Sequence, residues 1–210
     1  RFVYNSGSQL LRANRNDGSE LSLIKDFSPS VIYDLEWYDS DKFYLVLKNG
    51  GNPYSLSSWD ESLDSLTAKT SNIKEFQRLD GTHILGIDNQ DRLLFATDIS
   101  FSGASLVAPV HHSYKEPLLS PSLNFIYAIK IIHPDSHHLV RIPWSGTTLF
   151  GEELNLSQII ASQEIIFDTL DLKYDNNQDE IYFLGSIPAS APTSLYKVSS
   201  EGTGLTILSP

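Results

Sequence analysis

Two sets of short apolar segments recur along the chain at nearly the same interval, and this repeat restricts the fold more than any other feature. The first set, rich in aromatic and β-branched residues, spans residues 2–4, 43–47, 83–87, 125–129 and 181–184. Its spacings are 41, 40, 42 and 55 residues when it is aligned on Val3, Tyr44, Ile84, Ile126 and Ile181. The second set has spacings of 43, 40, 45 and 56 residues when it is aligned on Leu11, Tyr54, Leu94, Leu139 and Leu195. Two sets that share one period and one long last step indicate an internal repeat of about 42 residues.

The segments around these two sets complete a four-stranded unit. Turns rich in glycine and acids follow the second set at residues 16–18, 102–103, 145–146 and 201–202. Short strand-like segments come after three of these turns, at residues 21–24, 105–108 and 205–208. Segments that partly alternate apolar and polar residues precede the first set at residues 32–37, 74–79 and 168–174. Such alternation is typical of half-buried strands, so each unit is predicted to be four short antiparallel strands.

A four-stranded sheet of this size cannot bury both of its faces alone, and radial packing against neighbouring sheets solves the problem. The sequence therefore predicts an all-β fold, a β-propeller of about five four-stranded antiparallel blades. Helical solenoids would show helical periodicity or a shorter period. An immunoglobulin-like sandwich also has short strands, but it does not repeat two sets of segments at the same interval. The expected units are residues 1–29, 30–72, 73–110, 111–165 and 166–210. The first lacks its inner strand, so either a five-bladed ring closes imperfectly or, as we favour, the chain is part of a larger six- or seven-bladed ring.

The charge and the missing residue types limit the partners and the chemistry. Lys and Arg number 15 against 26 Asp and Glu, a net charge of -11, which disfavours nucleic acid and anionic membranes as partners. Cys is absent, which excludes disulfides and thiolate chemistry, and Met is absent too. No apolar run reaches the roughly 18 residues of a membrane-spanning helix, so no transmembrane segment is expected. A strand-like start without Met leads us to expect that the chain begins inside a longer polypeptide.

Two kinds of turn carry a resemblance to a known group of propellers. Residues 11–19 and 195–204 resemble the Leu-Tyr-Lys-Val-x-x-Asp-Gly-Thr-Gly strand and turn of TolB-like propellers. Residues 119–124 and 37–42 resemble degenerate copies of the Trp-Ser-Pro-Asp-Gly-Lys turn of the same repeats. The repeat is also similar to that of YWTD propellers, although the tetrapeptide itself does not occur here. The TolB-like resemblance implies a periplasmic, cell-surface or secreted location and a protein-binding role.

Motifs for catalysis or cofactor binding are absent, so no catalytic residue, metal or cofactor is expected. The His-containing segment 133–138 is predicted to be a hairpin loop, and its neighbouring His137 and His138 would point to opposite faces of a strand. The acidic segments 60–64 and 175–180 lack the spacing of a calcium loop and are predicted to be turns. Phosphate-binding and nucleophile motifs do not occur. Carboxylates that different blades bring to a shared channel would escape such a search.

The departures from the repeat supply the candidate recognition residues. Trp59 and Trp144 follow the second-set strand at similar points, where they either meet a partner or pack between blades. An insertion of about 14 residues around Gly151–Phe167 lengthens the last step. Insertions in repeat proteins map to loops on one face, often the binding face. The expected recognition surface comprises Trp59, Trp144, Glu152, Glu153, Gln158 and Gln163. Trp37, at the end of an inner strand, is expected in the core.

The favoured hypothesis is a non-enzymatic propeller that presents loops to a protein or glycan partner. The alternatives are a propeller glycoside hydrolase or lyase with carboxylates in its channel, and a scaffold domain of a larger protein. Three or more Asp, Glu or His side chains at the channel would favour the enzyme. A channel plugged by apolar side chains would favour the binding protein.

Overall fold

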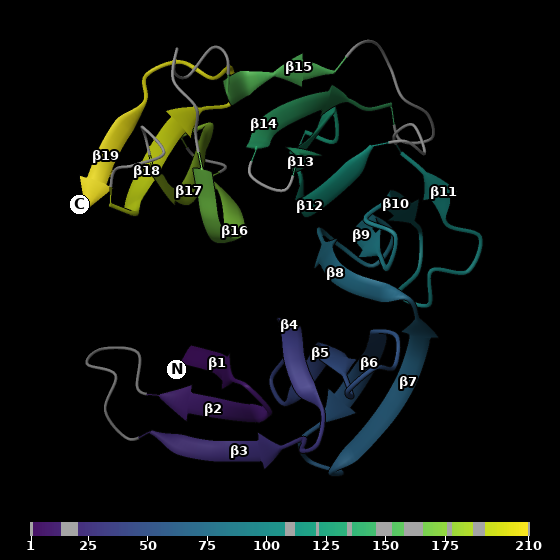
Figure 1. Ribbon diagram of the computed structural model, residues 1–210. Helices are drawn as coiled ribbons and strands as arrows, with labels where there is room; N and C mark the ends of the chain where they lie inside the picture. Colours follow the sequence, from purple (N-terminus) through teal and green to yellow (C-terminus); the bar gives the residue numbers. More distant parts are fainter. Residues whose placement is uncertain are drawn as a thin grey trace.

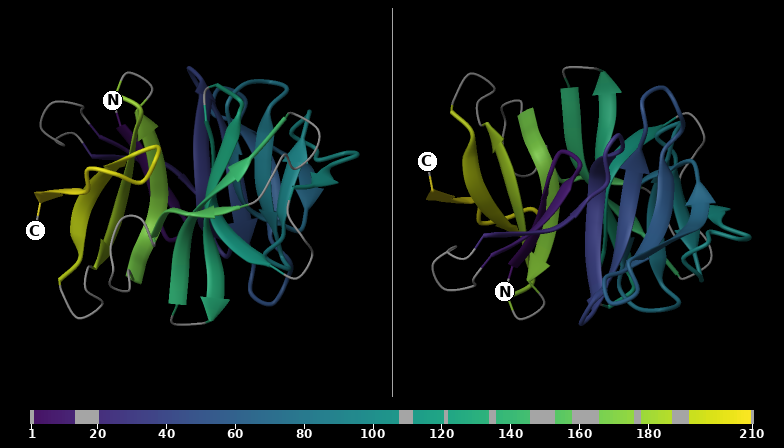
Figure 2. Two further views of the ribbon diagram at one scale, coloured as in Figure 1. Left: turned by 90° about the horizontal axis from the view of Figure 1, so that it is seen from above. Right: turned by 90° about the horizontal axis from the view of Figure 1, so that it is seen from below.

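The computed structural model describes residues 2–13, 21–107, 112–120, 122–133, 136–145, 153–157, 166–175, 178–186 and 192–209. Within them the chain forms five antiparallel sheets, arranged radially around a central space (Figure 1). Seen from the side, from above and from below the view of Figure 1, the sheets stand beside one another as twisted blades (Figure 2). The predicted five-bladed β-propeller is confirmed.

Each blade is built from consecutive strands. The first sheet comprises β1 (Phe2–Ser6), β2 (Gln9–Ala13) and β3 (Ser22–Asp26). The second comprises β4 (Val31–Asp39), β5 (Lys42–Lys48), β6 (Ser55–Asp60) and β7 (Ser65–Ser71). The third comprises β8 (Ile73–Arg78), β9 (Ile84–Asp88), β10 (Leu93–Ala96) and β11 (Ser105–Leu106).

The last two blades follow the same order. The fourth comprises β12 (Ser113–Leu119), β13 (Phe125–His133), β14 (Ser136–Pro143) and β15 (Leu154–Asn155). The fifth comprises β16 (Ile166–Asp175), β17 (Glu180–Ser186), β18 (Ser194–Ser199) and β19 (Thr206–Ser209). In blades two to five the first strand lies innermost, so β4, β8, β12 and β16 surround the central space (Figure 1). The described part of the first blade has three strands.

The hydrophobic core is divided among the contacts between neighbouring blades. One cluster joins Leu10 of the first blade to Phe43 and Trp59 of the second. A second cluster joins Leu56 of the second blade to Phe76 of the third. Two further clusters join the third blade to the fourth and the fourth to the fifth. Each blade therefore buries its faces against its neighbours, as the size of the repeat requires.

Two local expectations change in the structure. Trp37 was expected in the core, and this is wrong, because its side chain is 45% exposed. The indole stacks on Phe43 and donates a hydrogen bond to the carbonyl of Asp39, beside a bulge near the end of β4. The His-containing segment 133–138 belongs largely to strands, since β13 runs to His133 and β14 begins at Ser136. Among the described residues, no helix is long and apolar enough to cross a membrane.

Gly86 on the buried strand β9 offers a test of the packing between strand and loop. A Cβ atom at this position would lie 2.5 Å from Cε1 of Phe101, whose ring covers the strand. We expect Gly86→Ala to lower the free energy of unfolding by about 1–3 kcal/mol, because overpacking displaces the ring. Urea denaturation measures this change, with Gly51→Ala as the control, since a Cβ at Gly51 meets nothing within 4 Å. Equal stability of the two variants would contradict the packing described here.

Candidate functional site

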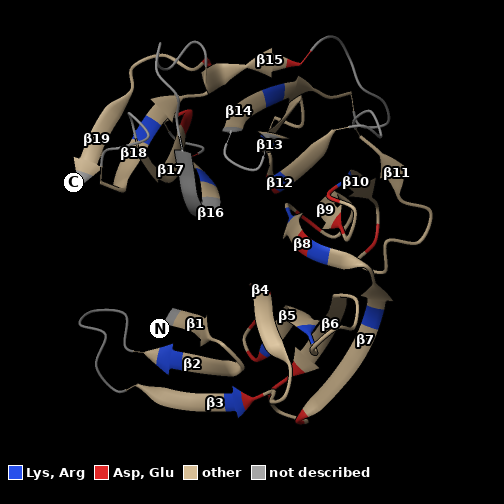
Figure 3. Cartoon of the chain, viewed as in Figure 1, with Lys and Arg blue, Asp and Glu red and all other residues tan. Residues whose placement is uncertain are grey.

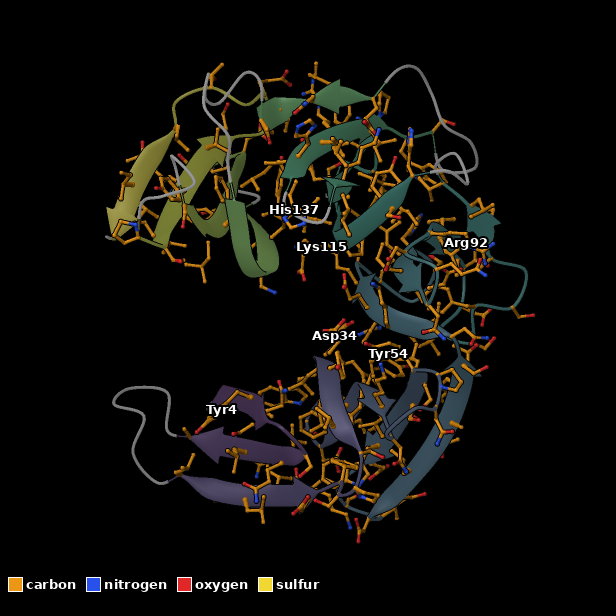
Figure 4. All side chains as sticks on the ribbon, in the orientation of Figure 1. Tyr4, Asp34, Tyr54, Arg92, Lys115 and His137 are labelled. Atoms are coloured by element: carbon orange, nitrogen blue, oxygen red, sulfur yellow. The ribbon has the colours of Figure 1, made fainter. Side chains whose placement is uncertain are left out.

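The inner strands line a partly open cavity of about 790 Å³ at the centre of the ring. Its walls come from β1, β4, β8, β12 and β16, together with Tyr54 directly before β6. The polar side chains in its lining are Tyr4, Asn5, Tyr33, Asp34, Glu36, Tyr54, Lys74, Glu75, Gln77, Arg78, Glu116 and Lys173. Figure 4 shows Asp34 and Lys115 on the sides of their blades that face the central space. Among the described residues, polar side chains thus outnumber apolar ones in the lining of the cavity.

A repeated carboxylate contact joins successive inner strands. Asp34 on β4 accepts a hydrogen bond from the backbone N–H of Phe76 on β8, at 2.8 Å. Glu75 on β8 accepts one from the backbone N–H of Glu116 on β12, at 2.6 Å. The three acids Asp34, Glu75 and Glu116 stand at steps of 41 residues. The same position in the second, third and fourth repeats therefore bears an acid, and two of these acids bind the neighbouring blade.

Bulges in the inner strands accompany these contacts. The ladder of β4 with β5 shifts between Ile32 and Asp34, and that of β8 with β9 shifts between Ile73 and Glu75. The ladder of β12 with β13 shifts between Lys115 and Leu118, and Glu116 in this bulge has a φ of 54°. A bulge re-aims side chains and frees backbone groups from the ladder. Here it turns the acid toward the next blade and leaves the N–H of Glu116 to be bound by Glu75.

A second row of contacts lies two residues further along the strands. Glu36 on β4 accepts a hydrogen bond from Nε of Arg78 on β8, at 2.9 Å. Gln77 on β8 accepts one from the backbone N–H of Leu119 on β12, at 2.6 Å. The guanidinium of Arg78 also lies 5.4 Å and 5.5 Å from the ring centroids of Tyr38 and Tyr44, which stack on each other. Charged and aromatic groups on this wall are held in fixed positions.

Burial shifts the pKa of three charged groups near the central space. It raises the pKa of Glu75, against the opposing effect of the Glu116 N–H. It also raises the pKa of Glu36, against the attraction of Arg78. Burial lowers the pKa of Lys115 on β12. In each case removal from water disfavours the charged form.

Basic side chains balance the acids in the channel. Figure 3 shows basic positions on the inner strands β8 and β16. Lys74, Arg78 and Lys173 line the cavity beside four carboxylates, those of Asp34, Glu36, Glu75 and Glu116. Among the described residues, no group of three or more His, Asp or Glu is placed to hold a metal ion.

The predicted recognition residues that the structure describes, Trp59, Trp144 and Glu153, do not line this cavity. Trp59 and Trp144 are each 2% exposed, so both indoles pack between blades, which was the alternative weighed for them. Glu153 accepts hydrogen bonds from the hydroxyl of Tyr114 and the ammonium of Lys130, both at 2.8 Å. Glu152, Gln158 and Gln163 lie outside the described residues. The described candidates therefore do not form one surface.

No model of a known protein family matches the sequence. No curated protein matches it either. Solved structures do match its fold. A protein assigned as TolB from Agrobacterium tumefaciens is 12% identical, with a TM-score of 0.66 over 98% of this chain and 75% of that one. A chain of a mitotic checkpoint complex is 12% identical, with a TM-score of 0.60 over 98% and 72%.

A protein assigned as a 6-phosphogluconolactonase from Bacteroides fragilis is 11% identical, with a TM-score of 0.51 over 97% of this chain and 78% of that one. At such identities the matches establish the fold and nothing finer. The chain is a β-propeller, and the resemblance to TolB-like propellers is confirmed at the level of the fold.

Glu75 allows the contact between inner strands to be tested through its pH dependence. Burial raises its pKa above the ordinary value of 4.5, so its contribution to stability is full below that pH and falls as the pH rises through the raised value. Glu75→Gln keeps an acceptor for the Glu116 N–H, as Gln77 does for Leu119. We expect this variant to gain stability relative to the wild type between pH 4 and pH 7.

Glu75→Ala is the matched variant, because it leaves the Glu116 N–H without its acceptor. We expect it to lower the free energy of unfolding by about 1–3 kcal/mol at pH 7. Urea denaturation of the three proteins at both pH values measures these effects. If Gln and Ala destabilise the protein equally, the carboxylate does not hold β12 as described.

Proposed function

We propose that the chain is a recognition propeller that binds a segment of a partner protein in its central cavity. The observation that carries this proposal is the polar cavity of about 790 Å³ formed by the inner strands. Its volume lies within the range of about 300–1,000 Å³ of pockets that bind ligands. A cavity with preset charges and rings loses little conformational entropy when a partner enters.

The residue types in the lining support a protein partner. Tyr4, Tyr33 and Tyr54 present rings with polar hydroxyls, and Arg78 supplies a fixed guanidinium. Tyr and Arg are enriched where proteins meet, because they combine large contact area with hydrogen bonding. We place the protein in the cell envelope or among secreted proteins, in line with the TolB-like resemblance.

A displayed library of random twelve-residue peptides tests the proposal. Peptides selected on the wild-type protein are expected to lose about tenfold in affinity for Tyr33→Ala, because a contact in the cavity is removed. Leu63→Ala is the control, since Leu63 is 73% exposed on the turn between β6 and β7 and does not line the cavity. An array of oligosaccharides is probed in parallel. Binding to sugars alone would indicate a glycan partner in place of a protein. Peptide binding that Tyr33→Ala leaves unchanged would show that the cavity is not the binding site.

A second candidate function is a glycoside hydrolase or lyase. The four carboxylates in the cavity favour it, because an enzyme of this kind would place several acids at the channel. Glu36 and Glu75, whose pKa values are raised by burial, have the property of a general acid. Recognition is preferred because Asp34, Glu36 and Glu75 are already engaged with groups of the next blade.

Nitrophenyl glycosides of common sugars test this second candidate. If it holds, Glu75→Gln will lower the rate of hydrolysis by about 100-fold or more, the contribution of a general acid. Asp41→Asn, in the turn between β4 and β5 and outside the cavity lining, serves as the control. Absence of hydrolysis by the wild type, or a rate unchanged by Glu75→Gln, would exclude this role for Glu75.

A further inference from the structure

Two tyrosines form an aromatic pair on the cavity wall of the second blade. Tyr33 on β4 and Tyr54 before β6 both line the cavity, and their ring centroids lie 4.6 Å apart at an interplanar angle of 89°. Tyr33 is 53% exposed. Figure 4 shows Tyr54 on the part of its blade near Asp34. The pair thus contributes two aromatic rings to the lining of a polar cavity.

A cation of the same chain already lies on this pair. Nζ of Lys48 is 4.3 Å from the ring centroid of Tyr54 and 5.8 Å from that of Tyr33. Lys48 ends β5, and its backbone pairs with Val31, which lies two residues before Tyr33 on β4. Within the described part of the chain, no salt bridge of Lys48 is formed. Its ammonium is therefore held here by the two aromatic rings.

Two acids of β4 near the pair favour positive charge, and of these Glu36 is already paired with Arg78. Asp34 follows Tyr33 directly on β4 and lines the same cavity, as does Glu36. The chain as a whole has a net charge of -11, which attracts cations over a distance. A ring face attracts an ammonium or guanidinium through its quadrupole, worth about 0.5–1 kcal/mol when exposed and more when water is excluded.

We propose that Tyr33 and Tyr54 recognise a lysine or arginine side chain of the partner segment, and that Lys48 occupies this site in the free protein. Lys48 has a flexible stem, so its ammonium can leave the rings without movement of the strands. The partner's cation then takes its place, and Lys48 acts as an internal competitor that lowers the apparent affinity. This inference rests on the proposed function, since it names the side chain that the cavity selects.

Titration with tetramethylammonium ion isolates the aromatic site, because this cation donates no hydrogen bond. Tyrosine ring resonances are followed by NMR in the wild type and in Lys48→Gln. We expect Lys48→Gln to bind the ion about five- to tenfold more tightly, since the competitor is removed. Neutral tert-butyl alcohol is the matched probe and is expected to leave the Tyr33 and Tyr54 resonances unchanged.

The double variant Lys48→Gln/Tyr54→Leu is the second arm and is expected to lose the saturable shift of Tyr33. Amide spectra of each variant establish that the fold is kept. Equal affinity of the wild type and Lys48→Gln, or a response confined to Tyr38 and Tyr44, would overturn the inference. So would equal binding of the neutral probe.

Failure of this inference is distinguishable from failure of the proposed function. The peptides selected on the wild type are remade with norleucine in place of lysine and citrulline in place of arginine. Affinity that depends on Tyr33 but not on these cations would retain the recognition cavity and overturn the cation site. If replacing these cations lowers the affinity for Tyr54→Leu less than it lowers the affinity for the wild type, the cation site is supported.

Discussion

The contact between neighbouring blades is the constraint on which the rest of the structure depends. Each sheet is too small to fold around a core of its own, and the four apolar clusters each draw side chains from two successive blades. Trp59 illustrates the point, since its ring centroid lies 5.6 Å from that of Phe27, after the last strand of the first blade, and 5.6 Å from that of Phe43 in the second blade. A radial stack of this kind leaves the inner strand of each blade with one edge directed at the axis. The central cavity follows from the same packing that stabilises the sheets.

The polar contacts of the inner strands complete what apolar packing begins. Apolar clusters hold the blades together without fixing their register, because the hydrophobic effect is not directional. Hydrogen bonds from Phe76 to Asp34 and from Glu116 to Glu75 are directional, and their acceptors occupy the same place in successive blades. Burial of Glu75 carries a cost, visible in its raised pKa, and the contact with the Glu116 N–H offsets part of it. Channel acids in this chain therefore have a structural task before any other.

The repeat allowed the fold to be predicted, because one register governs the strand order in every blade. The site was less accessible. Trp59 and Trp144 were selected as large aromatics near turns, yet both fill contacts between blades. Trp37 was assigned to the core by its strand position, but the bulge beside Asp39 leaves its indole exposed. Asp34, Glu75 and Glu116 carried a usable signal, namely acids at steps of 41 residues, the period of the repeat itself. Their partners could not be found in this way, since a bulge decides which backbone N–H is free.

The inner-strand side chains differ in how they are fixed, and this difference bears on where binding energy can arise. Asp34, Glu36 and Glu75 bind groups of the next blade, so a ligand that recruited them would have to replace hydrogen bonds that already exist. A partner gains little by exchanging one buried hydrogen bond for another. The ring of Tyr33 contacts Tyr54 and Lys48 of its own blade, and more than half of the Tyr33 surface is exposed. Covering that surface removes aromatic area from water without breaking a contact between blades. The tyrosine wall of the second blade is thus the part of the cavity where a partner gains most at least cost to the ring.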